Sequence, residues 1–578
     1  MRTSLVVALL LFSILGPAPS RAAGGDAPGR LAYAASLVRV GGGMRLAVEL
    51  SFPGGDAGRT RLYLPSHFSG QRALYENVHN LRAVSPGAAL ADTDQPDVKA
   101  VTFPAGRDVR VSYEIAPDPQ AASGQPGAYF RPTLSAQEFH GIGTALWAYP
   151  SQFGKTVSVS LHWTLPAGWT FCDSFGAGQT DQAFTGTLEQ FLASAYLAGD
   201  YRLCTVRAAG QPVTLALRGK WKSSDEALAA LTAHIVAAQR EFWEDRDFPY
   251  FLVARIPTET AGDGGGAADS DGGVELTHSV LLFEGKGRAL DFGLKYVLAH
   301  ELFHTWNAGE IRSDRLYWFS EGFTDYYARL LLLRAGLIST DEYARDVNRV
   351  VREYAQSPAR NRPGDEAARG FYAGSDLSRL PYQQGMLLAA RWNVQIRAAT
   401  GGRFSLDDAM RDLRRLARAG DAPVTAPDVA GAVSKYAPQA NPSGDVRRVV
   451  DGGGTLSPEP GALGPGWALR TVGVAPFEAG FDARATLDAR VVSGVKPKSR
   501  AFWAGLRDGQ EVLGCAPWTP GDAGGRIALT VRDVSGPRGI EWTPAGDPVP
   551  VPQFVRVKSV SDADCRAWFG NPAPPAAR

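Results

Sequence analysis

The sequence is poor in cysteine and has almost no net charge. Four of the 578 residues are cysteines, too few for a disulfide scaffold, and none form the C-x-x-C spacing of zinc or redox motifs. The formal net charge is +1 and no basic run of about five to eight residues occurs, so nucleic acid is not an expected partner. No apolar run approaches the 18 or more residues of a membrane-spanning helix.

What is present is the composition of an ordinary globular protein. Hydrophobic residues make up 44% and charged residues 21% of the chain, which gives enough apolar material for several cores. At roughly 150 residues per domain, the length predicts three or four domains.

The N-terminus has the pattern of a secretory signal peptide over residues 1–23. Arg2 precedes an apolar stretch from Leu5 to Gly16, prolines follow, and residues 20–22 offer a small-x-small cleavage site. We therefore expect an exported protein, periplasmic or secreted. Export would allow two local disulfides, or else all four cysteines are buried thiols; the pairs are Cys172 with Cys204 and Cys515 with Cys565.

The residue patterns change along the chain and predict a multidomain protein. Short strands of period two predict an N-terminal antiparallel β domain over residues 24–220, and helical patterns dominate residues 221–450. A Gly- and Pro-rich linker is predicted at 451–466, followed by a small β-containing domain at 467–568. The Gly/Asp-rich stretch 261–273 is expected to be partly mobile and to border a site, and residues 571–576 to form a frayed tail.

One motif carries chemistry. The motif His300-Glu301-Leu302-Phe303-His304 lies in a stretch whose apolar residues recur with the period of a helix. Its two histidines, four residues apart, therefore project from one face of that helix and could bind one metal ion. Catalytic zinc takes three protein ligands and leaves a position for water. Glu321, early in a second predicted helix, is the candidate third ligand, and Asp325 is placed to accept the free N–H of a ligand histidine.

Glu301 cannot easily reach the same metal and lies beside the open position. We therefore expect it to act as general base toward a water whose pKa the metal lowers to about 7, and to return the proton to a leaving amine. The reaction class is metal-assisted amide hydrolysis. Zinc, one ion per chain, suits His2Glu ligation best, although cobalt or manganese would also fit.

These residues resemble a known family. The strings from His300 to Asn307, from Trp318 to Tyr327 and from Arg334 to Leu337 resemble the glycyl aminopeptidase family of gluzincin zinc metallopeptidases. The resemblance implies an N-terminal β domain, a thermolysin-like, mainly α catalytic domain and a C-terminal PDZ-like α+β domain. It also implies peptide substrates with small N-terminal residues, glycine or alanine.

The resemblance extends the site in two places. Tyr382, in Pro381-Tyr382-Gln383-Gln384-Gly385 at the predicted start of a helix, matches a Tyr-x-x-Gly element and would donate a hydrogen bond to the tetrahedral oxyanion. Gly272-Gly273-Val274-Glu275 matches a Gly-Gly-Leu-Glu-His element, and Glu275 would hold the α-ammonium of the substrate. A carboxylate of this kind favours free N-termini over internal peptides.

The chain also departs from the family pattern. Leu276 replaces the usual histidine, and Ala308-Gly309-Glu310 stands where a basic run is usual, in a shortened segment before Glu321. The amine pocket and its rim are therefore expected to differ from those of typical members.

In the C-terminal region, the run from Ser499 to Gln510 resembles the signature of PDZ domains in bacterial proteases. Such domains bind an extended peptide as an added strand, but no carboxylate-binding loop is evident. The domain either binds a peptide or protein ligand or only supports the catalytic domain.

The sequence thus predicts an exported zinc aminopeptidase. An endopeptidase of the same fold is the alternative if Glu275 does not face the cleft, and a catalytically silent peptide-binding protein is the alternative from another class. The complete set His300, Glu301, His304, Glu321 and Tyr382 disfavours the silent protein.

Overall fold

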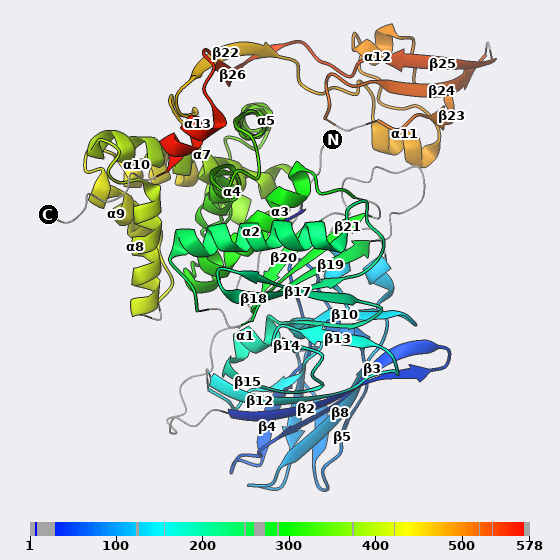
Figure 1. Ribbon diagram of the computed structural model, residues 1–578. Helices are drawn as coiled ribbons and strands as arrows, with labels where there is room; N and C mark the ends of the chain where they lie inside the picture. Colours follow the sequence, from blue (N-terminus) through cyan, green and yellow to red (C-terminus); the bar gives the residue numbers. More distant parts are fainter. Residues whose placement is uncertain are drawn as a thin grey trace, which may run out of the picture.

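The protein is represented by a computed structural model, which describes residues 6–7, 29–122, 127–154, 156–247, 250–258, 272–285, 288–372, 375–420, 422–518, 521–534 and 536–570. Most of the predicted signal peptide, most of the stretch 261–273 and the tail 571–576 lie outside these residues. Figure 1 shows a β-rich N-terminal part, a largely helical middle part, and a small C-terminal lobe at the end of a two-stranded ribbon.

The N-terminal domain consists of three sheets, with orders β15-β12-β2-β3-β8-β5, β11-β4-β7-β6 and β14-β13-β16-β10-β9. Side chains alternate between core and surface along β3, β8 and β12, which confirms the predicted period of two. The pairing is antiparallel apart from the parallel pair β2/β12. The strands are β2 (Gly29–Val40), β3 (Gly43–Phe52), β4 (Arg59–Tyr63), β5 (Val78–Ala83), β6 (Ala89–Asp92), β7 (Val98–Thr102), β8 (Val109–Ile115), β9 (Thr133–Leu134), β10 (Glu138–Ile142), β11 (Tyr149–Pro150), β12 (Thr156–Thr164), β13 (Thr170–Asp173), β14 (Gly176–Ala177), β15 (Asp181–Thr187) and β16 (Ala195–Gly199), with helix α1 (Leu188–Leu192) before β16.

The middle domain is built on a mixed sheet of order β1-β20-β21-β19-β18-β17. Its strands are β1 (Val6–Val7), β17 (Arg202–Ala208), β18 (Gln211–Leu217), β19 (Leu252–Thr258), β20 (Gly272–Leu276) and β21 (Ser279–Gly285). Because β18 pairs in parallel with β19, the hairpin β17–β18 belongs to this sheet. The predicted boundary after residue 220 therefore lies one hairpin too late.

This sheet is covered on both faces. Val213, Leu215 and Val253 point into the core formed with the helices. Ala216 and Leu252 point to the other face, against apolar residues of the N-terminal domain. The alternation of side chains along buried strands therefore fixes the N-terminal domain against the face of the sheet opposite the helices.

The helices of the middle domain enclose the larger core. They are α2 (Asp225–Trp243), α3 (Phe292–His304), α4 (Tyr317–Arg334), α5 (Thr340–Gln356), α6 (Gly364–Arg369), α7 (Ser375–Thr400), α8 (Leu406–Ala419), α9 (Ala426–Tyr436) and α10 (Pro442–Asp445). Ser224 caps α2 by accepting from the Ala227 N–H at 3.2 Å, where the sequence predicts a helix start.

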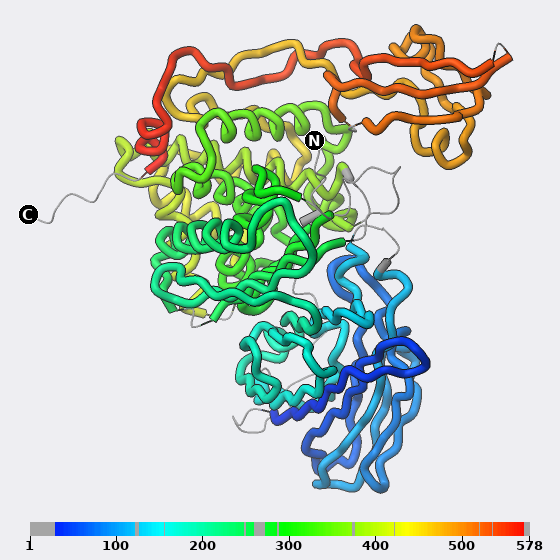
Figure 2. Tube along the Cα trace, turned by 45° about the vertical axis from the view of Figure 1, so that its right-hand side comes forward, coloured from blue at the N-terminus to red at the C-terminus, as the bar shows by residue number. Residues whose placement is uncertain are grey.

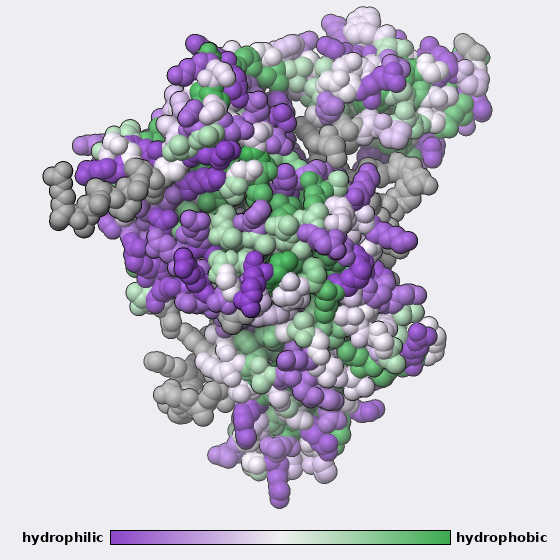
Figure 3. Space-filling model, viewed as in Figure 1, coloured by the Kyte–Doolittle hydropathy of each residue, from purple (hydrophilic) through white to green (hydrophobic). Residues whose placement is uncertain are grey.

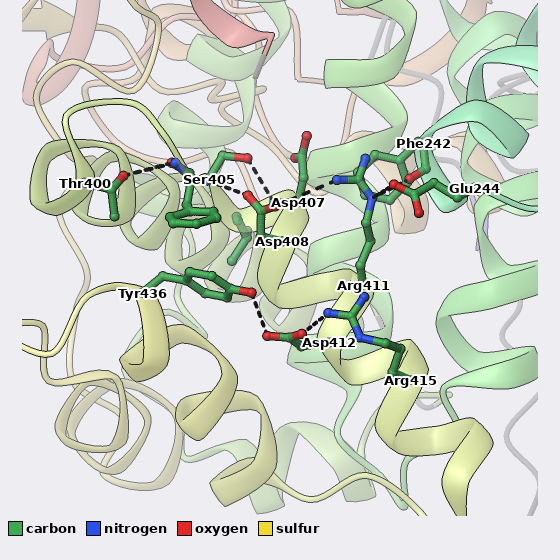
Figure 4. Close-up of polar contacts among 12 residues, drawn as sticks. Phe242, Glu244, Thr400, Ser405, Asp407, Asp408, Arg411, Asp412, Arg415 and Tyr436 are labelled. Atoms are coloured by element: carbon green, nitrogen blue, oxygen red, sulfur yellow. Dashed lines mark hydrogen bonds and ion pairs between the residues drawn. The ribbon is translucent and has the colours of Figure 1, made fainter. Parts of the chain in front are cut away.

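The outermost helix, α8, is tied to its neighbours by polar contacts that Figure 4 shows. Its N-terminus is closed by Asp408, whose carboxylate accepts from the Ser405 N–H at 2.9 Å. Arg411 donates to the Phe242 carbonyl on α2 at 3.0 Å, and Tyr436 on α9 donates to Asp412 at 2.8 Å. These bonds dock the polar helix onto the rest of the domain.

The C-terminal part is not a simple appended domain. The predicted linker 451–466 packs on the catalytic core, with Leu456 and Leu463 buried. The hairpin of β22 (Trp467–Val474) and β26 (Val549–Arg556) and helix α13 (Asp562–Phe569) contribute Phe554 and Phe569 to the same core.

Only residues 475–548 form a separate lobe, which we call the distal lobe (Figures 1 and 2). It has its own core around Phe481, Leu529 and Trp542. Its elements are α11 (Ala483–Ala489), α12 (Arg500–Trp503) and the sheet β23 (Glu511–Cys515), β24 (Ile527–Asp533) and β25 (Gly536–Trp542).

All four cysteines are free thiols in the structure. Cys172 and Cys204 belong to different cores, and so do Cys565 and Cys515. The arrangement favours unpaired thiols over the two disulfides that export would allow.

On the face shown in Figure 3, hydrophobic residues gather over the middle of the molecule and hydrophilic residues dominate its margins. Among the described residues, no helix has the length and apolar character needed to cross a membrane.

Candidate active site

Two crossing helices bring the predicted metal ligands together. His300 and His304, on α3, and Glu321, on α4, are all buried, and their candidate ligand atoms lie within 4.8 Å of one another. His300 Nε2 is 3.0 Å from His304 Nε2 and 3.3 Å from Glu321 Oε2, and His304 Nε2 is 3.5 Å from the same oxygen.

This donor set fits a zinc ion. Atoms bound at about 2.0–2.1 Å to one tetrahedral centre lie roughly 3.3 Å apart, close to the three separations here. Two imidazole nitrogens and a carboxylate oxygen converge on one point, and a cation bound there would be shared by all three. Burial opposes ionisation of Glu321, but His304 and His300 outweigh it and lower the pKa of the carboxyl.

The outer nitrogens of both histidines are also held. His300 Nδ1 lies 3.0 Å from Asp325 Oδ1, as the sequence predicts, and His304 Nδ1 lies 3.0 Å from the Asn307 carbonyl. Burial lowers the pKa of His300, but Asp325 and Glu321 outweigh it and raise this pKa to about 9. Both imidazoles therefore present Nε2 to the centre.

Glu301 lies in the same buried pocket but is not one of the three ligands. Burial raises the pKa of its carboxyl to about 8. The strand β20 passes directly over this side chain, because a Cβ added at Gly273 would lie 2.6 Å from Glu301 Cγ. Gly273 is therefore needed for the close approach, and Glu301 is confined between β20 and the ligand cluster.

Tyr382 reaches the ligand cluster from α7. Its ring lies 6.0 Å from that of His300, and burial followed by the charge of Glu321 raises the pKa of its phenol well above the usual value. Helix α7 begins at Ser375 and contains Pro381 in its interior. The prediction that Pro381 opens this helix is wrong, because the helix starts six residues earlier.

Glu275 lies on β20 at the edge of the pocket. It is half-buried, and burial followed by repulsion from Glu301 raises its pKa well above the ordinary value. A Cβ added at Gly309 would lie 3.8 Å from Glu275 Oε1, so the segment 308–310 borders this carboxylate. Gly272 and Gly273 precede Glu275 on the same strand. The structure thus brings all of the predicted site residues to one place.

Two further residues support the site and were not predicted. The Asn307 amide donates to the Phe319 and Ser320 carbonyls and to Thr324, so it ties the end of α3 to α4. Arg329 lies one helical turn after Asp325 and 3.0 Å from its carboxylate. The sequence feature that could have pointed to Arg329 is that a single arginine interrupts the apolar stretch in the second half of α4.

Comparisons with known proteins concern the segment that carries the metal ligands and the overall fold. Residues 294–368 match the model of the M61 glycyl aminopeptidase family. An aminopeptidase N family protein from Idiomarina loihiensis has a similar fold, with a TM-score of 0.69 at 15% identity over 93% of this chain and 100% of that chain. An M1 zinc metallopeptidase from Deinococcus radiodurans gives a TM-score of 0.47 at 15% identity over 75% of this chain and 95% of that chain. No curated protein matches.

The matched segment contains the two histidines, Glu301, Glu321 and Asp325. The three candidate metal ligands of the structure, His300, His304 and Glu321, therefore all lie in the segment that matches a metallopeptidase family. The family match and the His2Glu site together identify the chain as a zinc metallopeptidase whose residues 294–368 are similar to those of the M61 glycyl aminopeptidase family.

Proposed function

We propose that the protein removes the N-terminal residue of peptides, with Glu275 as the group that recognises the free α-ammonium. The observation that carries this proposal is the position of Glu275 beside the general-base candidate Glu301. A half-buried carboxylate pairs well with an ammonium and is left uncompensated when an internal peptide binds.

The residues of the site divide the chemistry between them. His300, His304 and Glu321 would hold zinc, which when bound supplies a Lewis acid and lowers the pKa of water toward about 7. Glu301 accepts the proton of the attacking water. It later delivers that proton to the leaving amine. The carbonyl oxygen becomes an oxyanion, to which Tyr382 donates its phenol hydrogen.

The raised pKa values suit these roles. Burial raises the pKa of the Glu301 carboxyl and so makes its ionised form a stronger base than an ordinary glutamate, and the charge of zinc, when bound, would favour that ionised form. The high pKa of Tyr382 keeps the phenol protonated, so it can act as a hydrogen-bond donor throughout turnover.

Preference for glycine or alanine at the cleaved N-terminus is part of the proposal. It is supported by the family match and by the small residue Gly309, where an added Cβ would lie 3.8 Å from Glu275 Oε1. Export to a periplasm or beyond is likewise proposed, on the sequence pattern of residues 1–23 alone. The distal lobe is proposed to be PDZ-like on its Ser499–Gln510 motif, whose Ser499 caps α12.

The test pairs metal content with cleavage of Gly- and Ala-peptides, free and N-acetylated, with and without a chelator. We expect about one zinc per chain and chelator-sensitive cleavage of free N-termini only. Glu275→Gln should lose this discrimination while it keeps its zinc. Equal cleavage of acetylated peptides by the unaltered protein would instead establish an endopeptidase.

A further inference from the structure

A line of charges of alternating sign runs from the metal site to helix α5, and all of its members except the last, Arg349, are buried. Asp325 Oδ1 faces His300 Nδ1 at 3.0 Å, and Asp325 Oδ2 lies 3.0 Å from Arg329 Nη1. Arg329 Nε donates to Asp346 Oδ2 at 2.6 Å, and Arg349 Nε donates to Asp346 Oδ1 at 2.6 Å. The line therefore connects α3, α4 and α5.

Arg329 is the central member of this line and is almost completely buried. Its side chain is 1% exposed, against 6% for Asp325. The guanidinium lies 4.2 Å from the ring centre of Tyr296, whose hydroxyl donates to Asp325. Burying a guanidinium costs free energy unless its N–H donors are paired. Here the guanidinium contacts the carboxylates of both Asp325 and Asp346.

We propose that Arg329 is a positioning residue for zinc binding, acting through Asp325 on the ligand His300. Tyr296 and His300 occupy one oxygen of the Asp325 carboxylate and Arg329 occupies the other, so the carboxylate has one orientation. That orientation holds His300 Nδ1 and turns Nε2 toward His304 and Glu321. Without Arg329, Asp325 keeps its contacts through Oδ1 only, and its second oxygen is left buried without the charge that fixes it.

The planar shape of arginine matters for this role. Arg329 bonds Asp346 through Nε, and through Nη1 it contacts the Asp325 carboxylate and donates to the Asp325 backbone carbonyl at 2.7 Å. A lysine ammonium is a point charge on a flexible stem and cannot reproduce this fork. Asp346, on α5, is the outer anchor that prevents the guanidinium from turning away.

Zinc affinity tests the proposal without reference to which peptides are cleaved, so it can fail independently of the proposed function. The dissociation constant of zinc is measured by competition with a chelator at fixed pH for Arg329→Met and Arg329→Lys. We expect Arg329→Met to weaken binding about 10- to 100-fold, as loss of outer partners of metal ligands does. Arg329→Lys should recover only part of that loss.

Arg334→Met is the matched control. Arg334 is a second inward-facing arginine of α4, paired with Asp407 at 2.8 Å and donating to the Phe569 carbonyl at 2.6 Å. The Arg334→Met substitution should lower the melting temperature of the protein while leaving its zinc affinity unchanged. If Arg329→Met and Arg334→Met destabilise alike and neither changes zinc affinity, Arg329 is only a structural residue and the proposal is overturned.

Asp346→Asn covers the case in which Arg329→Met does not fold. It keeps the arginine and removes only the charge of the outer anchor, so we expect a several-fold weaker zinc affinity. An affinity equal to that of the unaltered protein would overturn the proposal as well.

Discussion

Gly322 on α4 and Gly385 on α7 face each other where the two helices cross. A Cβ at Gly322 would lie 2.3 Å from the Cα of Gly385, and one at Gly385 would lie 1.7 Å from the Trp318 carbonyl oxygen. Glu321 is the neighbour of the first glycine, and Tyr382 lies almost one turn before the second. The absence of both side chains therefore sets the approach of the phenol to the metal ligands.

Gly385→Ala should separate the two helices and reduce both stability and turnover. We expect a loss of about 1–3 kcal/mol in unfolding free energy, the usual result of overpacking, and a lower kcat at full zinc occupancy because Tyr382 moves away. Denaturant unfolding and kcat measurements check this. Gly431→Ala on α9, where an added Cβ meets nothing within 4 Å, is the control and should not destabilise. Unchanged stability in Gly385→Ala would contradict the tight crossing.

Glu301→Gln should keep its zinc and lose nearly all turnover. The amide preserves the shape of the side chain but cannot accept the proton of water, and loss of general acid–base catalysis costs about 10²- to 10⁴-fold in rate. His304→Ala should instead lose the metal. Zinc content by atomic absorption, measured beside kcat, separates the two variants, and a Glu301→Gln enzyme that still turns over would remove Glu301 from the mechanism.

The rim beside Glu275 is held in a strained conformation by an ion-pair cluster. Ala308 has φ +134°, a region that side chains other than glycine rarely adopt. Glu310 accepts two hydrogen bonds each from Arg414 and Arg418, at 2.6–3.1 Å. These bonds hold the segment in place.

Glu310→Ala should release the rim and raise KM for peptides with free N-termini, on the order of tenfold, with a smaller change in kcat. Steady-state kinetics on a Gly-peptide measure it. Glu459→Ala removes a comparable pair with Arg391, at 3.1 Å, away from the rim and serves as the control. Equal KM values in the two variants would show that the ion pairs of Glu310 with Arg414 and Arg418 have no role in substrate binding.

From the buried carboxyl of Asp173 we predict that the stability of the fold depends on pH, independently of the metal site. Burial raises the pKa of this carboxyl to about 7, against three hydrogen bonds that lower it, and its Oδ2 has no partner in the described part of the chain. The folded pKa lies above the unfolded value of about 3.9, so the folded state binds more protons. Stability should therefore fall as pH rises from about 4 to 7.

Asp173→Asn removes this titration and should be more stable than the unaltered protein at pH 8, by on the order of 3 kcal/mol, but not at pH 4. Denaturant unfolding of both proteins across this range measures the difference. Asp92→Asn, an exposed carboxylate whose pKa Lys99 lowers, should show no such gain. A difference independent of pH would mean that Asp173 is ionised throughout.

The distal lobe should be removable without loss of the catalytic domain. Val474 and Val549 are paired neighbours across β22 and β26, so a two-residue Asn-Gly turn can replace residues 475–548. We expect this protein to fold and to bind zinc. Truncation after residue 466 should instead destabilise it strongly, because it removes Phe554 and Phe569 from the core. Thermal unfolding and zinc content distinguish the two, and equal stability would contradict the shared core.

The sequence predicts the metal site well because its signals are local. His300 and His304 are four residues apart on one helix, and Glu321 and Asp325 on another, so the spacing alone fixes which side chains share a face. The period-two strands of the N-terminal domain are predictable for the same reason.

What the sequence does not predict depends on contacts between distant segments. The hairpin β17–β18 looks like its upstream neighbours, and only its parallel pairing with β19 assigns it to the catalytic sheet. The stretch 451–466 has the composition of a linker, yet buried Leu456 and Leu463 anchor it. Arg329 is recognisable only once Asp346 approaches from α5, and the start of α7 at Ser375 overrides the usual preference of proline for a first turn.

The missing side chain of Gly273 has a consequence for how such an enzyme can diversify. One short strand carries both the carboxylate proposed to select the substrate and the backbone that presses on Glu301. A change that moves β20 to admit a different N-terminus also moves the group that takes up the proton. Substrate selection and turnover are thus mechanically linked through β20.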